Sequence, residues 1–217
     1  MRSPGPPTNG TRRPSRWSAT PNQALAWLAE LAGFPSTAGG VFVSGGSAGN
    51  LSALVTARAA ATERRGGRAP AGWRIAVAES VHSSVMTAAR VIDVEVEVVS
   101  GDERGRLTGA GLDAALGRLD PERAEGVFAV VASAGATNAG AVDDLAGAAD
   151  VCGRRGIWLH VDGAYGGAGL AAPSARERFA GIERADSFIV DPHKWLFAPY
   201  DCFALLYRAI YPGAFNL

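Results

Sequence analysis

The sequence predicts an α/β protein with a mostly parallel sheet and helices on both faces. From Pro21 to Tyr207, segments with helical periodicity alternate with short β-branched or aromatic runs. Several runs, such as VFAVVA, are apolar at consecutive positions, which is typical of strands buried on both faces. Alternating strands and helices imply right-handed crossovers between parallel strands.

The predicted strands define the sheet. Seven are predicted: Val41–Val43, Arg74–Ala78, Val94–Val99, Gly126–Ala132, Ile157–Val161, Ser187–Val190 and Cys202–Tyr207. The predicted helices are Asn22–Ala32, Ala48–Arg65, Ser83–Val91, Ala110–Leu119, Asp143–Arg155 and a short segment, Ser174–Phe179. Because no long helix connects the last two strands, we expect the final strand to run antiparallel.

Composition favours one ordered domain after a short lead-in. The first twenty residues, MRSPGPPTNGTRRPSRWSAT, are rich in Pro, Gly and Arg and lack apolar periodicity. We therefore expect residues 1–20 to be disordered and residues 21–217 to form the domain. An apolar fraction of 47% can fill a core, and a charged fraction of 19% argues against overall disorder.

The charge balance excludes several classes of partner. Lys+Arg 21 and Asp+Glu 21 give a net charge of zero, whereas nucleic acids and anionic membranes reward a basic surplus. No segment reaches the roughly 18 consecutive apolar residues of a membrane span. The two cysteines, Cys152 and Cys202, lie in apolar stretches and suggest no disulfide framework. We expect a reduced, cytoplasmic protein.

Polar side chains follow most of the predicted strands directly. Ligands of open α/β sheets bind outside the carboxyl ends of the strands. The segments at these ends are Ser44–Ser47, Glu79–His82, Ser133–Thr137, Asp162 and Asp191–Lys194. They contain two of the three histidines and Lys194, the only lysine in the chain. A ligand site is therefore predicted at this edge of the sheet.

The stretch SGGSAGN, residues 44–50, is the candidate phosphate site. Glycines let the backbone approach an anion, and the helix that follows offers free N–H groups and a positive dipole end. Ser47 and the neighbouring amides would hold the phosphate. No Gly-Lys-Ser/Thr closes the stretch, so it is not a Walker A loop. The alternative is an ordinary Gly-rich turn.

Lys194 is the candidate amine nucleophile. An apolar setting formed by Trp195, Leu196 and Phe197 would disfavour the charged ammonium and leave a free amine that can attack a carbonyl. The alternative is a solvated surface lysine.

Asp162 and His82 each have two interpretations, and His160 has one. Asp162 either pairs with a protonated ring nitrogen or caps a helix. His82 either stacks on a flat ligand or caps the end of its strand. His160 lies inside its strand and is assigned a structural role. A phosphate cradle, an amine, a carboxylate and a stacking ring together describe a pyridoxal 5′-phosphate site.

The same residues carry a resemblance to a known family. GVFVSGGSAGNLSAL, ESVHSSV, SAGATNAGAVDDL, WLHVDGAYGG and DPHKWLFAPYDC occur in the order and with spacing similar to the group II pyridoxal-phosphate-dependent decarboxylases. This family includes aromatic amino acid, glutamate and diaminobutyrate decarboxylases. The match runs from about Asn22 to Tyr207. DPHKW with HVDGAYGG upstream is highly specific, whereas GGSAGN alone is weak.

The resemblance implies a role for each matching residue. Lys194 would form the internal aldimine, Asp162 would pair with the pyridine nitrogen, and His82 would stack on the ring. Ala164 would pack on the opposite face, and Thr137 would lie near the ring hydroxyl. The phosphate would be served by Gly46, Ser47, Asp191 and His193. The implied reaction is the decarboxylation of an L-amino acid to the amine and CO₂, in a homodimer with the type I, aspartate aminotransferase-like fold.

This sequence departs from the family pattern at three single positions, each occupied by a small residue, and in its length. Ala48 stands where many members have Glu, Ala136 where a Thr is frequent, and Gly163 where Ala is common. Members are about twice as long, with an N-terminal segment and a C-terminal small domain. We therefore expect this chain to be the large, cofactor-binding domain, and a non-catalytic remnant that binds the cofactor without turnover is the alternative.

A third interpretation comes from a different class of enzyme. GGSAG also satisfies G-x-S-x-G, the nucleophile elbow of α/β-hydrolases, and Ser47, Asp162 and His193 follow in the order of that triad. No HGGG-type oxyanion segment precedes the serine, and an esterase gives Lys194 and His82 no role.

Overall fold

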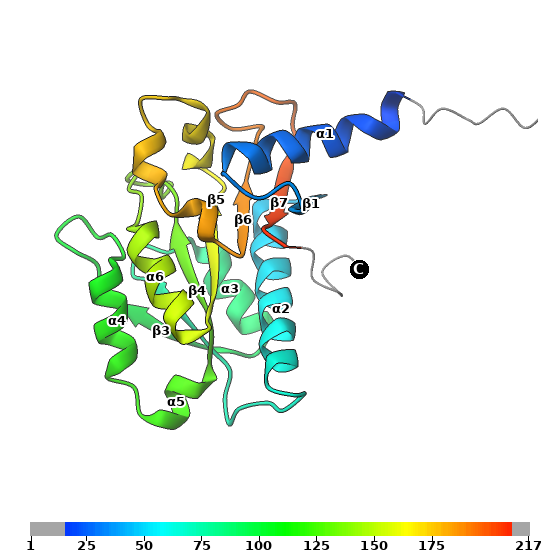
Figure 1. The fold of residues 1–217 in the computed structure, drawn as a ribbon. Helices are drawn as coiled ribbons and strands as arrows, with labels where there is room; N and C mark the ends of the chain where they lie inside the picture. Colours follow the sequence, from blue (N-terminus) through cyan, green and yellow to red (C-terminus); the bar gives the residue numbers. More distant parts are fainter. Residues whose placement is uncertain (1–15, 210–217) are drawn as a thin grey trace, which may run out of the picture.

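A computed structural model describes residues 16–209 and contains one seven-stranded sheet, in the order β1-β7-β6-β5-β4-β2-β3 (Figure 1). The strands are β1 Gly39–Val43, β2 Arg74–Ala78, β3 Glu95–Val99, β4 Val127–Ser133, β5 Trp158–Gly163, β6 Ser187–Val190 and β7 Phe203–Tyr207. All seven predicted strands are present with small shifts at their ends. The predicted fold class is confirmed.

Strand direction brings the predicted ligand segments to one edge. β2 to β6 pair in parallel with their neighbours, whereas β7 is antiparallel to both β6 and β1. The antiparallel last strand is therefore confirmed. Because β7 is antiparallel to both of its neighbours, β1 runs in the same direction as β6 and the other inner strands. The carboxyl ends of β1, β2, β4, β5 and β6 consequently share one edge of the sheet.

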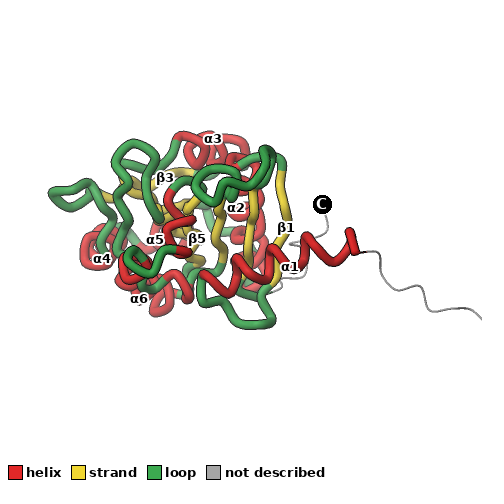
Figure 2. The backbone as a smooth tube through the Cα atoms, turned by 90° about the horizontal axis from the view of Figure 1, so that it is seen from above, coloured by secondary structure: helices red, strands yellow, loops and turns green. Residues whose placement is uncertain are grey.

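Helices cover both faces and give three layers (Figure 2). One face is covered by α2 Gly46–Arg64 and α3 Ser83–Val91, and the other by α1 Arg16–Leu31, α4 Gly109–Gly117 and α6 Leu145–Arg155. Side chains alternate between the two cores: Ile75 and Val77 pack beneath α2 and α3, while Ala76 and Ala78 belong to the opposite core. This alternation explains the consecutive apolar residues in the strands.

Close packing of α2 on the sheet depends on a small residue. A Cβ added to Gly49 would overlap the Ile189 side chain of β6. One turn further on, Ala53 and Leu54 are fully buried in the same core. The helix that begins at the ligand edge is therefore held directly against the centre of the sheet, which fixes the position of its N-terminus.

The N-terminal boundary differs from the prediction. α1 begins at Arg16, within the segment expected to be a disordered lead-in, and it passes through Pro21 rather than starting after it. Proline removes one backbone donor and a helix can continue at that cost. The expectation for residues 1–15 lies outside the described part of the chain.

Several short helices differ from the sequence prediction as well. α5 Pro121–Gly126 was not predicted, although Asp120 caps it and Pro121 occupies its first position, which is a recognisable start signal. The single short segment predicted near Ser174 is one of three 3₁₀ turns: η1 Gly166–Ala171, η2 Arg176–Phe179 and η3 Ile182–Arg184.

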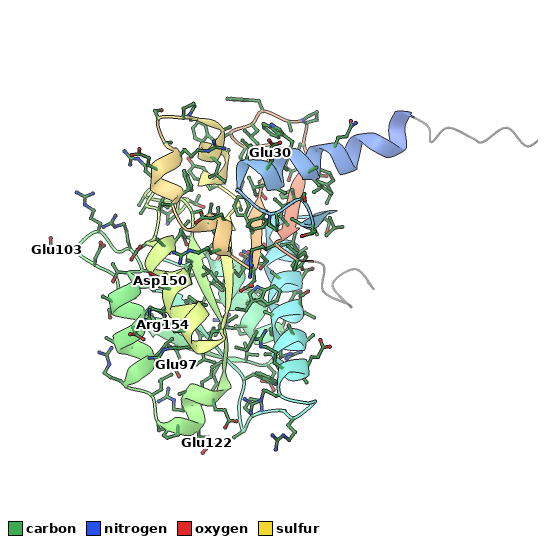
Figure 3. The ribbon with its side chains drawn as sticks, in the orientation of Figure 1. Glu30, Glu97, Glu103, Glu122, Asp150 and Arg154 are labelled. Carbon is green, nitrogen blue, oxygen red and sulfur yellow. The ribbon has the colours of Figure 1, made fainter. Side chains whose placement is uncertain are left out.

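Charged side chains lie mainly on the outside of the layers. Glu103, Glu122 and Arg154 point away from the sheet (Figure 3). Within the described residues, none of the helices combines the length and the apolar character needed to cross a bilayer.

Candidate cofactor site

A cavity of about 660 Å³ lies at the carboxyl edge of the sheet. It collects side chains from the ends of β1, β2, β4, β5 and β6, which are far apart in the sequence. Every site residue predicted from the sequence lines it: Gly46, Ser47, His82, Thr137, Asp162, Ala164, Asp191, His193 and Lys194. The structure therefore brings the predicted set together, as the rule for open α/β sheets requires.

Lys194 and Asp191 form an ion pair at the floor of this cavity. Nζ of Lys194 lies 2.7 Å from Oδ2 of Asp191, and the two side chains are 34% and 1% exposed. Burial raises the pKa of Asp191, although the hydrogen bond and charge of Lys194 oppose this. Among the described residues, Oδ1 of Asp191 has no hydrogen-bond partner. The pair thus holds a buried carboxylate with one cation and one unused acceptor.

The apolar surroundings predicted for Lys194 are not observed. Trp195 and Phe197 are 55% and 84% exposed, so their side chains do not enclose the amine. Trp195 instead packs edge-on against Tyr165, with ring centroids 5.8 Å apart. The residues that follow Lys194 do not surround its amine, because the side chain turns back to Asp191, three residues earlier.

Asp162 is held by hydrogen bonds to both carboxylate oxygens. Asn50 Nδ2 donates to Oδ2 at 2.8 Å, and the backbone N–H of Ala164 donates to Oδ1 at 3.1 Å. The side chain is buried, and it caps none of the described helices. A carboxylate held by two donors in a buried place is ready to accept a further hydrogen bond from a ligand cation.

His82 combines its predicted position in the site with the alternative role as a cap. Its Nδ1 accepts the backbone N–H of Ser84 at 3.2 Å and caps the N-terminus of α3. The Ser84 hydroxyl lies 2.8 Å from the same nitrogen. The side chain thus caps helix α3 rather than the end of its strand, and it lines the cavity at the same time.

The N-terminus of α2 supplies the candidate anion site. No side chain caps this helix, and its first N–H groups lack intrahelical partners. A Cβ on Gly46 would lie 3.3 Å from Oδ2 of Asp191 and 3.6 Å from Cβ of Ala164, so the wall is tight here. Free amides, Ser47 and a positive helix end suit a phosphate group.

The catalytic triad of the esterase interpretation is not assembled. His193 Nδ1 donates to the Cys202 carbonyl at 2.9 Å, and its ring packs against Phe203 with centroids 4.5 Å apart. Both oxygens of Asp162 are used by Asn50 and Ala164. Among the described residues, no hydrogen bond joins His193 to Asp162 or to Ser47. The base lacks its carboxylate partner, so this interpretation is not supported.

Two buried polar residues of the cavity wall were not singled out from the sequence. Asn50 and Ser84 both line the cavity and are buried. Helical spacing could have found Asn50, because it lies four residues after Gly46 and so shares its face of α2. Ser84 had no signal in the sequence, since its role depends on a contact with a helix 34 positions away.

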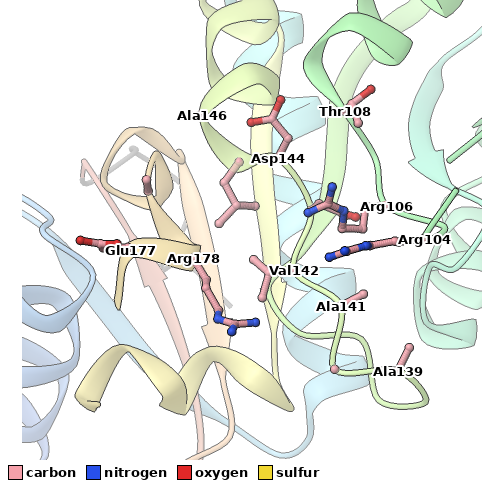
Figure 4. A pocket seen from close by; sticks show the side chains of 14 residues that line it. Arg104, Arg106, Thr108, Ala139, Ala141, Val142, Asp144, Ala146, Glu177 and Arg178 are labelled. Atoms are coloured by element: carbon pink, nitrogen blue, oxygen red, sulfur yellow. The ribbon is translucent and has the colours of Figure 1, made fainter. Parts of the chain in front are cut away.

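A second cavity of about 640 Å³ is lined in part by the loop that follows β4, which contributes Ala139, Ala141 and Val142 (Figure 4). Arg104, Arg106 and Arg178 line it, but none of the predicted site residues does. Arg106 is paired with Asp102, and the carboxylate of Asp144 accepts two backbone N–H groups. With arginines and acidic side chains mixed in its walls, this cavity has no one-sided charge that would select a ligand.

The fold and the first cavity together define a class of protein. An open α/β sheet presents a primary amine, a buried carboxylate, an imidazole and an uncapped helix N-terminus around one space. These are the groups that a phosphorylated pyridine aldehyde needs: an amine for the aldehyde, an acid for the ring nitrogen and donors for the phosphate. The residues present therefore fit pyridoxal 5′-phosphate.

Comparison with known proteins gives the family. Residues 18–211 match the family model described as the pyridoxal-dependent decarboxylase conserved domain. This chain belongs to that family. An aromatic-L-amino-acid decarboxylase of Bacillus atrophaeus is 38% identical over 187 residues, which cover 85% of this chain and 38% of the relative.

Solved structures agree with this assignment. The glutamate decarboxylase domain of a Vibrio parahaemolyticus protein superposes with a TM-score of 0.81 at 31% identity, covering 88% of this chain and 44% of that one. Oryza sativa TDC, solved with PLP and tryptamine, gives 0.76 at 32% identity, covering 88% and 45%. The chain thus spans about two fifths of the length of the relatives it matches.

Proposed function

We propose that this chain binds pyridoxal 5′-phosphate and serves in the decarboxylation of an L-amino acid. One observation carries the proposal: the only lysine, the buried Asp162, His82 and the N-terminus of α2 line a single cavity. Residues 21–217 would then correspond to the large, cofactor-binding domain of the family. The names of the relatives, which include aromatic amino acid and diaminobutyrate decarboxylases, support this class of reaction.

Each residue has a part in holding the cofactor. Lys194 would hold it through the ε-amine, Asp162 would accept a hydrogen bond from the ring nitrogen, and His82 would stack on one face of the ring opposite Ala164. Thr137 would lie beside the ring hydroxyl. The phosphate would be held by Gly46, Ser47, Asp191 and His193.

The chemistry divides between the cofactor and the chain. When bound, the cofactor supplies an electron sink for the pair left behind as CO₂ departs. Asp162 would keep the ring nitrogen protonated, and its own two donors hold the carboxylate in place. Asp191 would orient the Lys194 side chain through the ion pair, because its Oδ2 is 2.7 Å from Nζ.

Reductive trapping tests binding without requiring turnover. The protein is mixed with pyridoxal 5′-phosphate, reduced with borohydride, digested and analysed by mass spectrometry. Because Lys194 is the only lysine of the chain, a pyridoxyl group on lysine can come only from this site. We expect one label in the wild type and none on that peptide in Lys194→Ala. An unlabelled wild-type chain would refute the proposal.

Turnover is tested separately from binding. The wild-type chain is incubated with cofactor and a panel of aromatic, acidic and diamino L-amino acids, and release of CO₂ and amine is measured. Release that is lost in Lys194→Ala supports the decarboxylase. Labelling of Lys194 without release from any substrate supports the non-catalytic alternative.

Assembly and location follow from the family only as expectations. We infer a homodimer, since the resemblance implies it, and light scattering after gel filtration measures the mass of the particle. A cytoplasmic location is inferred from the two cysteines, which are free thiols in the structure.

A further inference from the structure

Asn50 is a buried amide of α2 that contacts polar side chains from β5 and α3. Its side chain is 1% exposed. Nδ2 lies 2.8 Å from Oδ2 of Asp162 and 3.0 Å from Oγ of Ser84, while Oδ1 lies 2.9 Å from Nε2 of His160. Both polar atoms of one amide are therefore fully used within the cavity wall.

The chemistry of its partners fixes which way this amide points. A carboxylate oxygen can only accept, so the atom facing Asp162 must be the NH₂ group. The oxygen then faces His160, and Nε2 of that ring must carry a proton. Burial lowers the pKa of His160 to about 4, so the ring is neutral and its Nδ1 has no proton.

The remaining hydrogen bonds of His160 follow the same direction. Its Nδ1 accepts the Ser187 hydroxyl at 2.8 Å, and Trp158 Nε1 donates to Oγ of Ser187 at 2.9 Å. Every donor from Trp158 onward thus points along one chain that ends on the carboxylate of Asp162. Aligned hydrogen bonds of this kind polarise one another in a buried site.

A second branch leads from Asn50 to the ring of His82. Ser84 Oγ accepts from Asn50, which leaves its proton for Nδ1 of His82 at 2.8 Å. The backbone N–H of Ser84 donates to the same nitrogen. Nδ1 of His82 therefore accepts twice, and the proton of the ring lies on Nε2.

We propose that Asn50 is a positioning residue of the cofactor site, whose single amide orients the Asp162 carboxylate and, through Ser84, directs a second donor to Nδ1 of His82. The link to the cofactor rests on the proposed function, whereas the hydrogen-bonded chain exists in the protein by itself. Two groups proposed to touch the cofactor from different elements are thereby set by one side chain.

A purely structural role for Asn50 is the competing explanation, since the same amide also ties α2 to α3 and β5. Thr56→Val provides the matched control. Thr56 is a buried residue of the same helix, its hydroxyl lies 3.1 Å from that of Tyr207, and it does not line the cavity. Its loss removes a buried hydrogen bond from α2 without touching the chain to Asp162.

The test uses the protein without cofactor. The chain has only three histidines, so their NMR signals are few. Long-range ¹H–¹⁵N correlation spectra of ¹⁵N-labelled protein report which ring nitrogen carries the proton. The wild type is expected to show Nε2–H at both His82 and His160. Asn50→Leu removes the acceptor of His160, so its proton should move to Nδ1, where Ser187 Oγ can accept it. Asn50→Asp keeps that acceptor, so His160 should keep its proton on Nε2, but the variant sets a second carboxyl group against Asp162 in place of a donor.

Cofactor affinity supplies the second measurement. Titration with pyridoxal 5′-phosphate should give a dissociation constant about tenfold higher for Asn50→Leu, the size expected for one charge-assisted hydrogen bond to Asp162. Thr56→Val should stay within about twofold of the wild type and show unchanged histidine spectra, even where both variants melt at a lower temperature.

The outcomes separate the inference from the proposed function. A wild-type His160 spectrum in Asn50→Leu would overturn the positioning role, as would equal effects of Asn50→Leu and Thr56→Val on affinity. Should Asn50→Leu fail to fold, Asn50→Asp decides the question: it should lower cofactor affinity while His160 keeps its proton on Nε2, and wild-type affinity in this variant would overturn the positioning role. A wild-type chain that binds no cofactor yet shows the expected spectra would refute the proposed function and leave the hydrogen-bonded chain established.

Discussion

Replacing Asp191 by asparagine tests how its carboxylate controls the Lys194 amine. The amine must be unprotonated before it can attack an aldehyde. In the wild type Oδ2 of Asp191 lies 2.7 Å from Nζ, and a paired carboxylate stabilises the ammonium form. Asp191→Asn keeps the size and an oxygen but removes the negative charge. The free amine should therefore be more abundant in the variant.

The size of the effect follows from the strength of the ion pair. A hydrogen bond to a charged group is worth about 1.5–3 kcal/mol, and the partial exposure of Lys194 favours the lower end of this range. Loss of the carboxylate should therefore raise the fraction of free amine, and with it the trapping rate, about tenfold. In both proteins the amine releases its proton to water, so both rates should rise with pH between about 6 and 8.

Timed borohydride quenching measures this rate. Protein and pyridoxal 5′-phosphate are mixed, reduced at set intervals, and the lysine-bearing peptide is quantified by mass spectrometry. Asp186→Asn is the control, because this carboxylate precedes β6 at the opposite edge of the sheet and pairs with Arg208. It should keep the wild-type profile. Equal trapping rates for wild type and Asp191→Asn at each pH would show that the Asp191 carboxylate does not stabilise the ammonium.

Three further outcomes concern stability. Gly49→Ala should lower the unfolding free energy by about 1–3 kcal/mol in urea, because its Cβ overlaps Ile189, and an unchanged midpoint would contradict that packing. Leu54→Ala, at a fully buried site, should cost about 2–5 kcal/mol in the same assay. Burial raises the pKa of Asp143 to about 6, so its protonated form favours folding; the unfolding free energy should fall by about 2 kcal/mol from pH 4 to 6, and Asp143→Asn should lack this change.

The predictions that held were those that depend on local pattern. The apolar run VFAVVA predicts a strand buried on both faces, and β4 is buried at every residue. The stretch from Ser44 to Asn50 predicts a strand–helix junction, and α2 begins at Gly46. Because the carboxyl ends of parallel strands lie at one edge of a sheet, the sequence alone placed the polar residues after β2, β5 and β6 in one site.

The predictions that failed required knowledge of distant contacts. Trp195 and Phe197 look like an apolar wall for Lys194, yet they are exposed and the amine turns to Asp191. There, a neighbour in sequence was taken for a neighbour in space. The start of the first helix was also wrong, since it was expected at Asn22 and α1 begins at Arg16 and continues through Pro21.

The amino-acid sequence by itself determined the layered α/β fold, the edge at which a ligand binds and the residue types that fit the cofactor, because these depend on periodicity and on chemistry carried by single side chains. Only the tertiary structure decided that Asn50 holds Asp162, 112 positions away, and that Asp191 holds Lys194. Hydrogen bonds of this kind depend on strand order and on the depth at which α2 packs, and neither is encoded in any short stretch of the chain.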